Sequence, residues 1–392
     1  MELALYCPVY GYYEKEEDSI GTRGDYYTSV SVGNLFGELL AFQFARWLVE
    51  SPLSGQWQGL SQDRHPLPDG QSAGQGPTSA SGGLVQLAEA GAHRGQLAKD
   101  ILGWLREQRP ELFARLEYWI IEPSSRRRAW QKATLSEFAD RVRWAGRLSE
   151  LAWAGVSSPA SARPPGICGI IFANELLDAL PVHRLGWDAK DRSWFEWGVS
   201  CHGERFVWTR LQHGRPPTCL TLAGLGMPAD LLEVLPDNFT VEVCPAARQW
   251  WLEAAQSLAC GKLLTFDYGL SAEEFFLPHR HEGTLRAYYR HQLHQAVLEL
   301  PGEQDITASV DFTALREAGE SAGLHTEAFD RQGPFLTRVA APVLESNPAW
   351  STERTRQFHT LTHPDLLGHA FRALVQSRGT ALTTLEAPAV RS

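Results

Sequence analysis

Two apolar runs end in acidic residues at spacings suited to binding a nucleoside. Residues 84–88 form a short apolar run that leads to Glu89, and Gly91 and Gly95 follow in the stretch E-A-G-A-H-R-G. Glycines allow a tight turn and let a ligand approach the main chain. The N–H groups of the helix that follows can bind a carboxylate or another anion. This glycine spacing alone is equally typical of a plain strand-to-helix turn.

Glu122 strengthens the nucleoside interpretation. It follows residues 116–121, a second apolar run one strand–helix unit further along the chain. Ligands of open α/β sheets lie beyond the carboxyl ends of the strands, where an acid can accept both hydroxyls of a ribose. The alternative is an exposed acid, or one paired with Arg126 or Arg127. Together, Glu122 and the glycine turn favour nucleoside binding.

The glycine turn also argues against a dinucleotide. His93 stands where the fingerprint G-x-G-x-x-G has a glycine, so the close backbone approach to a pyrophosphate is weakened. A nucleotide-dependent oxidoreductase is therefore a weaker alternative.

A third polar group consists of Asn174, Glu175 and Asp178, which follow the apolar run 167–173. This run places an amide and two carboxylates at the same sheet edge as Glu122. Packing gives no reason for polar groups to gather there, although Asn174 or Asp178 could cap a helix start. We favour a functional role, and the residues alone indicate a nucleophilic acceptor near two acids.

The elements that must position these residues alternate between strand and helix. Such alternation predicts an α/β fold with a mainly parallel, doubly wound sheet, and we expect its later strands near 240–243, 262–266, 325–329 and 335–340. Alternating runs between 182 and 211 predict an antiparallel β insertion. We expect an N-terminal lid and helix (1–50), a flexible Gly/Ser-rich insertion (51–83), the two halves of the α/β domain (84–181 and 236–345), a β-rich insertion (182–235) and a C-terminal helical segment (346–392).

Composition limits the classes of partner. The chain has 392 residues and a formal net charge of −10, which disfavours a broad nucleic-acid surface. Its six cysteines are scattered, a spacing that suits neither a metal site nor a disulfide framework and fits a reducing compartment. No apolar run is long enough for membrane insertion, and the first residues do not form a signal peptide. We therefore expect a cytoplasmic protein.

Ordered sequence blocks make the comparison with a known family specific. They include L-Y-C-P-V-Y-G-Y-Y (5–13), G-D-Y-Y-T-S (24–29), E-A-G-A-H-R-G-Q-L-A-K-D-I-L (89–102), I-I-E-P-S (120–124), A-N-E-L-L-D-A-L-P-V-H-R (173–184), D-Y-G (267–269), G-T-L-R-A-Y (283–288), D-I-T-A-S-V-D-F (305–312) and H-P-D-L-L-G-H-A-F (363–371). The chain resembles the MidA-like class I methyltransferases, which include the mitochondrial protein arginine methyltransferase that assists assembly of respiratory complex I.

The resemblance implies a Rossmann-like domain, S-adenosylmethionine as cofactor, no metal and a protein substrate. A respiratory-complex subunit is the candidate substrate, and we also consider a homodimer. The Tyr/Gly-rich N-terminus would fold over the cofactor. The implied cofactor-binding residues are Tyr27, Thr28, Glu89, Gly91, His93, Gly95, Glu122, Pro123, Ser124 and Asn174.

The implied reaction is methylation of an arginine side chain. Paired carboxylates can orient a guanidinium because each accepts two hydrogen bonds from its planar fork. Glu175 and Asp178 are the candidates for this role, and Asn174 lies beside them. His93 and Gln96 replace the Gly and Thr usual in the family, so a catalytically weak or inactive assembly factor that still binds the cofactor is the alternative.

Overall fold

The computed structural model describes residues 1–15, 28–50, 84–153, 166–211, 229–290, 292–294, 296–346 and 349–379. The insertion expected at 51–83 and the cofactor-binding candidate Tyr27 lie outside these residues. Within the described part, no helix combines the length and apolar character needed to cross a membrane.

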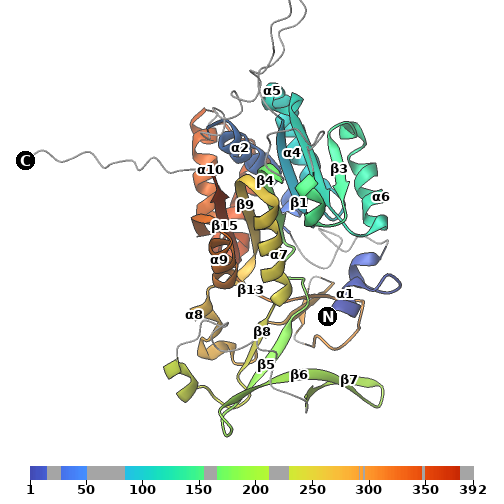
Figure 1. The fold of residues 1–392 in the computed structure, drawn as a ribbon, viewed down its shortest axis with the longest axis vertical. Helices are drawn as coiled ribbons and strands as arrows, with labels where there is room; N and C mark the ends of the chain where they lie inside the picture. Colours follow the sequence, from blue (N-terminus) through green and yellow to red (C-terminus); the bar gives the residue numbers. More distant parts are fainter. Residues whose placement is uncertain are drawn as a thin grey trace, which may run out of the picture.

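The central sheet has the strand order β14-β15-β9-β4-β1-β2-β3 (Figure 1). All neighbouring strands are parallel except β15, which is antiparallel to both β9 and β14. A short strand, β13 (Val310–Asp311), pairs with β9. The strands of the main path are β1 (Val85–Ala90), β2 (Leu116–Ile121), β3 (Val142–Ala145), β4 (Ile167–Asn174), β9 (Leu258–Leu270), β14 (His325–Arg331) and β15 (Phe371–Arg378).

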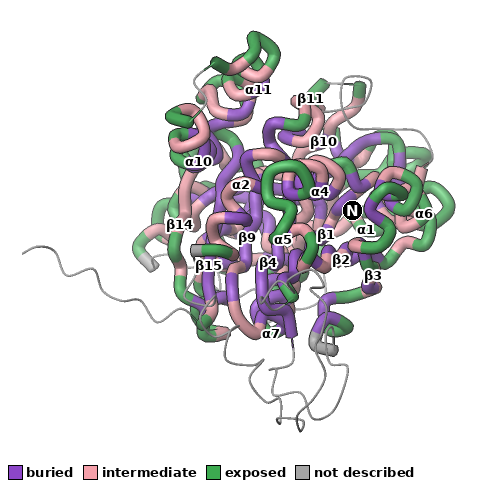
Figure 2. The backbone as a smooth tube through the Cα atoms, turned by 90° about the horizontal axis from the view of Figure 1, so that it is seen from above, coloured by how far each residue is buried: buried purple, intermediate pink, exposed green. Residues whose placement is uncertain are grey.

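Helices cover both faces of this sheet because its central strands are apolar on both sides. In β4, Ile170 and Phe172 belong to one core cluster, whereas Ile171 belongs to the other. The first cluster includes residues of α2 (Leu35–Glu50), α4 (Gln96–Gln108) and α10 (Gln332–Ser346), and the second includes residues of α7 (Pro245–Ser257) and α9 (Phe312–Ser321). Figure 2 shows the buried strands running between these helices. The remaining helices include α5 (Pro110–Ala114), α6 (Ser125–Thr134), α8 (Ala272–Phe275) and α11 (Thr352–Thr362).

Two smaller antiparallel sheets lie beside the α/β core. The first has the order β7-β6-β5-β8 and the second the order β11-β10-β12. Helix α1 (Glu2–Tyr6) lies between the central sheet and the β6–β7 hairpin (Figure 1), and its Leu5 packs with Ala287 of the second small sheet. The strands are β5 (His183–Asp188), β6 (Ser193–His202), β7 (Arg205–Arg210), β8 (Thr240–Val243), β10 (Arg286–Tyr289), β11 (Gln292–His294) and β12 (Asp305–Thr307).

Three expected elements differ from the structure. Strand 240–243 pairs with β5 instead of joining the central sheet, and residues 335–340 lie in α10, where Leu336, Val339 and Ala340 form a buried face. The segment 346–392, expected to be helical, contains α11 but also β15, which lies inside the sheet. Short apolar runs do not distinguish strand from helix. The polar Gln376 obscures β15, but it is fully buried and accepts a hydrogen bond from Trp251.

The cysteine interpretation also needs correction. Cys168 and Cys260 form a disulfide with a Cα–Cα distance of 4.7 Å. They are direct partners in the register of β4 and β9, although 92 residues separate them in sequence. Sequence spacing could not reveal this pair because only the strand order brings the two positions together.

Candidate active site

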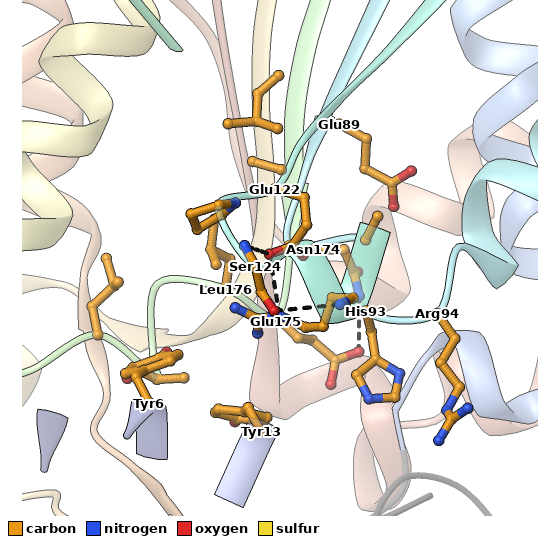
Figure 3. A pocket seen from close by; sticks show the side chains of 18 of the residues that line it. Tyr6, Tyr13, Glu89, His93, Arg94, Glu122, Ser124, Asn174, Glu175 and Leu176 are labelled. Atoms are coloured by element: carbon orange, nitrogen blue, oxygen red, sulfur yellow. Dashed lines mark hydrogen bonds and ion pairs between the residues drawn. The ribbon is translucent and has the colours of Figure 1, made fainter. Parts of the chain in front are cut away.

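A cavity of about 1110 Å³ lies beyond the carboxyl ends of β1, β2 and β4. It is large for a small-molecule site, and Figure 3 shows polar side chains from several elements converging on it. Gly95 and Asp178 do not line it. The sequence-predicted residues that do line it are Thr28, Glu89, Gly91, His93, Glu122, Pro123, Ser124, Asn174 and Glu175.

The turn between β1 and α4 uses three left-handed residues. Gly91 and Gly95 have φ angles of 76° and 85°, and His93 has a φ of 43°. A Cβ on Gly91 would lie 3.1 Å from Leu176, so a side chain there would crowd the cavity wall. Gly95 is the N-cap of α4, and a Cβ there would lie 3.2 Å from Leu135. Gly91 therefore shapes the cavity, whereas Gly95 supports the turn from behind.

Glu89 lies at the end of β1 with only 2% of its surface exposed. The Tyr118 hydroxyl donates a hydrogen bond to its Oε2 at 2.6 Å. Burial raises the pKa of Glu89 to about 7, and the Tyr118 hydrogen bond opposes the rise. A cationic ligand group would favour the carboxylate form.

Glu122 both lines the cavity and pairs with an arginine. Its Oε1 accepts a hydrogen bond from the Ser124 N–H at 2.9 Å and lies 3.1 Å from Arg127 Nε. Gln131 Nε2 donates to Oε2 at 3.2 Å. Burial raises the pKa of Glu122, and Arg127 opposes that rise. The two interpretations offered by the sequence, a ligand-facing acid and an acid paired with Arg127, are therefore compatible.

The N-terminal segment forms part of the cavity wall and supplies residues that were not singled out from the sequence. Tyr6, Tyr13 and Glu14 line the cavity. Tyr6 donates a hydrogen bond to the Ala179 carbonyl at 3.1 Å, and Ser124 donates to Glu14 at 3.1 Å. The block L-Y-C-P-V-Y-G-Y-Y was the available signal, but nothing in it specified which tyrosine faces the cavity.

The turn after β4 holds Glu175 in a left-handed conformation with a φ of 51°. Its Oε1 accepts hydrogen bonds from the Ser29 N–H and from Asn174 Nδ2, both at 3.0 Å. Burial raises the pKa of Glu175 to about 8, and the Asp178 charge contributes to the rise. No helix starts in residues 174–180, so the alternative that Asn174 or Asp178 caps a helix is wrong.

Asn174 has a polar atom without a partner among the described residues. The residue is 8% exposed and lines the cavity. Its Oδ1 is buried and accepts no hydrogen bond from any described residue. An orphaned buried acceptor is costly unless a ligand or water satisfies it. The cavity is therefore suited to a ligand that donates a hydrogen bond at this point.

Asp178 differs from its sequence-predicted position. It is 6% exposed, lies outside the cavity lining and is hydrogen-bonded to Asp267 of β9. Arg286 is the nearby positive charge that favours its ionised form. Glu175 and Asp178 were both expected to face the substrate. This expectation is wrong for Asp178, because the turn directs it towards β9.

The strand order with one antiparallel strand and the cavity at the strand ends define a class I methyltransferase fold. The family model described as "Putative S-adenosyl-L-methionine-dependent methyltransferase" matches residues 75–329. The chain belongs to this family, and its cofactor is S-adenosyl-L-methionine.

Curated relatives cover most of the chain. The mitochondrial protein arginine methyltransferase NDUFAF7 homologue of Drosophila melanogaster is 26% identical over 98% of this chain and 82% of its own length. The mitochondrial protein arginine methyltransferase NDUFAF7 of Homo sapiens is 29% identical over 95% of this chain and 77% of its own length.

A solved structure supports the fold and the cofactor. A protein from Burkholderia thailandensis, bound to S-adenosyl-homocysteine, matches with a TM-score of 0.73 and 28% identity. The match covers 96% of this chain and 86% of that chain. S-adenosyl-homocysteine is the product that remains after the methyl group has left.

The expectation of a cytoplasmic protein is contradicted by these comparisons, because the relatives are named as mitochondrial proteins. The prediction rested on the scattered cysteines and on the amino-acid composition of the first residues. Neither observation distinguishes the cytosol from another internal compartment.

Proposed function

We propose that this methyltransferase modifies an arginine side chain of a protein substrate. The observation that carries the proposal is the orphaned Asn174 Oδ1 beside the Glu175 carboxylate. These are two adjacent acceptors at a cavity wall. The names of the relatives, which are protein arginine methyltransferases, support the same substrate class.

The buried acids fit S-adenosylmethionine in type and position. Glu89 would hold the amino group of its methionine part, and the β1–α4 turn would bind the carboxylate through backbone N–H groups. Glu122 would accept the ribose hydroxyls, with Pro123 and Ser124 beside it. The tight contact that a Cβ on Gly91 would make with Leu176 supports a turn shaped to leave room for a ligand.

Asn174 and Glu175 would orient the guanidinium. Glu175 Oε1 already accepts two hydrogen bonds, whereas Oε2 accepts none from the described residues. A guanidinium carries five N–H donors in a planar fork, so one edge can donate to Glu175 Oε2 and Asn174 Oδ1. A neutral acceptor with a single donor would leave one of these two atoms unsatisfied.

The cofactor, when bound, supplies an electrophilic methyl group on a positively charged sulfur. Asn174 and Glu175 hold the acceptor nitrogen in line, and Tyr6 and Tyr13 help to exclude water. The methylated guanidinium must lose one proton. Glu175 is the group at the wall that can accept it, because burial raises its pKa to about 8 and a general base works best near the ambient pH.

Labelled S-adenosylmethionine tests this function. Purified protein would be incubated with mitochondrial extract from cells that lack it, and the labelled proteins would be hydrolysed to amino acids. We expect label in methylarginine with the wild type and almost none with Glu175→Gln. Label in another amino acid would refute the arginine assignment while leaving the methyltransferase in place.

The proposal also covers the identity of the substrate protein and the oligomeric state. The family resemblance supports a respiratory-complex subunit as substrate, and identification of the labelled band by mass spectrometry tests it. The homodimer is tested by the mass of the protein in solution. Cofactor binding without label in any extract protein would favour the assembly factor with weak or no turnover, for which the strained His93 (φ 43°) is the supporting observation.

A further inference from the structure

Glu175 is held at the cavity wall by the end of β9, a strand far away in sequence. The Glu175 N–H donates to the Phe266 carbonyl at 2.9 Å. The next two N–H groups, those of Leu176 and Leu177, donate to Asp267 Oδ2 at 3.2 and 2.8 Å. Three successive N–H groups of the turn therefore point at two consecutive residues of β9.

Asp267 is fully buried and does not line the cavity. Its second oxygen, Oδ1, accepts a hydrogen bond from the Tyr268 N–H at 2.8 Å, so the carboxyl group is fixed to its own strand. A non-glycine residue in the left-handed region persists only when its surroundings impose that conformation. Asp267 accepts two of the three backbone hydrogen bonds that the N–H groups of residues 175–177 donate to β9.

We propose that Asp267, the first residue of D-Y-G, is the positioning residue that fixes the turn 174–178 and thereby aims Glu175 at the acceptor. The D-Y-G block contributed to the family resemblance, but its residues were given no role in the site. The inference rests on the proposed function only for the identity of the acceptor. The positioning itself concerns the backbone of the turn.

Asp178 completes the arrangement. It is hydrogen-bonded to Asp267, and its own carbonyl accepts a hydrogen bond from the Ala308 N–H at 2.9 Å. Burial and the neighbouring carboxyl raise the pKa of Asp267, so the pair holds one proton between its members. The Arg286 guanidinium, which lies 5.0 Å from the Tyr268 ring centroid, is the positive charge facing the pair. Both ends of the turn are therefore tied to buried partners.

The test compares Asp267→Ala and Asp267→Asn with Asp311→Ala. Asp311 is a matched control because it is a half-buried aspartate beside the end of β9 that caps α9 through the Ala314 N–H. It makes no hydrogen bond to the turn. Two readouts are needed: methyl transfer per folded molecule at saturating cofactor, and hydrogen exchange of the amides of Leu176 and Leu177.

We expect Asp267→Ala to lower kcat at least about tenfold while the affinity for S-adenosyl-homocysteine stays within about threefold. The two amides should exchange at least about tenfold faster than in the wild type because their acceptor is lost. Asp267→Asn should recover part of kcat, since the amide oxygen can accept both N–H groups. Asp311→Ala should change neither readout, although its thermal midpoint should fall.

Several outcomes would overturn the inference. If Asp267→Ala keeps the wild-type kcat per folded molecule, Asp267 only supports the fold and does not position Glu175. Equal loss in the Ala and Asn variants would show that acceptance of the Leu176 and Leu177 N–H groups is not what positions Glu175. If the wild type labels an amino acid other than arginine, the proposed function fails. The amide exchange of the Asp267 variants still decides the positioning role in that case.

Discussion

The β2 end and the β4 end of the cavity differ in whether their polar side-chain atoms already have hydrogen-bond partners. At the β2 end, both oxygens of Glu122 already have partners, which come from Ser124, Gln131 and Arg127. At the β4 end, Asn174 Oδ1 accepts no hydrogen bond from the described residues, and Glu175 has a left-handed backbone. The first region is satisfied without a ligand, whereas the second carries strain and an orphaned acceptor.

This difference indicates a division of labour. A satisfied carboxylate in a fixed hydrogen-bond network costs little to reorganise when a ligand binds, as a cofactor site requires. Strain and unpaired polar atoms are tolerated where function needs them. We therefore expect substitutions at the β4 end to reduce the rate of methyl transfer, and substitutions at the β2 end to weaken cofactor binding.

The largest effect should come from Glu175→Gln. The amide keeps the shape of the side chain but can neither accept the proton nor carry the charge. We expect the rate of methyl transfer to fall by about 100-fold or more, within the range of a lost general base. The affinity for S-adenosyl-homocysteine, which lacks the sulfonium charge, should stay within about threefold of the wild type.

The control for this variant is Glu117→Gln, an acid on β2 that lies outside the cavity and accepts a hydrogen bond from Gln86. It should leave the rate unchanged. If Glu175→Gln shows normal turnover, Glu175 has no role in methyl transfer and the proposed difference between the two regions is wrong.

Glu122→Ala should have the next largest effect, this time on binding. Loss of charge-assisted hydrogen bonds to a buried diol should weaken S-adenosyl-homocysteine binding by roughly 1–3 kcal/mol. Isothermal titration calorimetry measures the change, and the rate at saturating cofactor should be almost normal. Since Glu122 also holds Arg127, Glu122→Gln serves as the milder variant. An unchanged affinity in both would place the ribose elsewhere.

The two regions also differ in how far they could be predicted from the sequence. At β1 and β2, apolar runs ending in Glu89 and Glu122 placed these acids at the cavity, because parallel strands end at one sheet edge. At β4, the same reasoning located Asn174 and Glu175 but misplaced Asp178. No periodicity governs the side-chain directions in an irregular turn, and the turn is fixed by Asp267, which is separated from Leu177 by 90 residues.

A similar contrast applies to the sheet. The strands β1 to β4 were located from the sequence, since short, mainly apolar runs there alternate with helical patterns. The last strand, β15, was not, because its buried polar residues depend on distant partners. Arg372, for example, donates hydrogen bonds to the Gly269 carbonyl and to Glu274. Only the folded arrangement satisfies these groups, so their types did not indicate a strand, and the segment 346–392 was expected to be helical.

A smaller effect should appear in the pH dependence of ligand affinity. Burial raises the pKa of Glu175 to about 8, so this group is largely neutral at pH 7 without a ligand. The cationic sulfonium favours the carboxylate, and binding therefore releases a proton from Glu175. The Glu175 contribution to S-adenosylmethionine affinity should rise with pH up to about 8 and then level off, at most about tenfold per pH unit.

S-adenosyl-homocysteine is the matched comparison, because it lacks the sulfonium charge but keeps the amino group that would contact Glu89. The ratio of the two affinities should therefore increase between about pH 6 and pH 8, and Glu175→Gln should make it independent of pH. A ratio that is flat in the wild type would show that Glu175 does not face the sulfur.

The smallest effect should come from His93→Gly, in the turn that joins β1 to α4. His93 has a φ of 43°, and relief of this left-handed strain favours the folded state by roughly 1–2 kcal/mol. Glycine costs about 0.5–1 kcal/mol in unfolded-state entropy, so the net stability change should be small. Cofactor affinity should rise by no more than about threefold, since the turn already has its cavity-lining form.

Gly95→Ala should have the opposite effect on stability. Gly95 has a left-handed φ of 85°, and a Cβ there would lie close to Leu135. The variant should therefore destabilise the turn by more than about 1 kcal/mol. Thermal unfolding and calorimetry on both variants measure these effects. If His93→Gly instead raises methyl transfer more than about tenfold, His93 obstructs the cofactor site in this chain. The β1–α4 turn would then contain the defect expected of a weakly active assembly factor, and the β4 side would remain competent for catalysis.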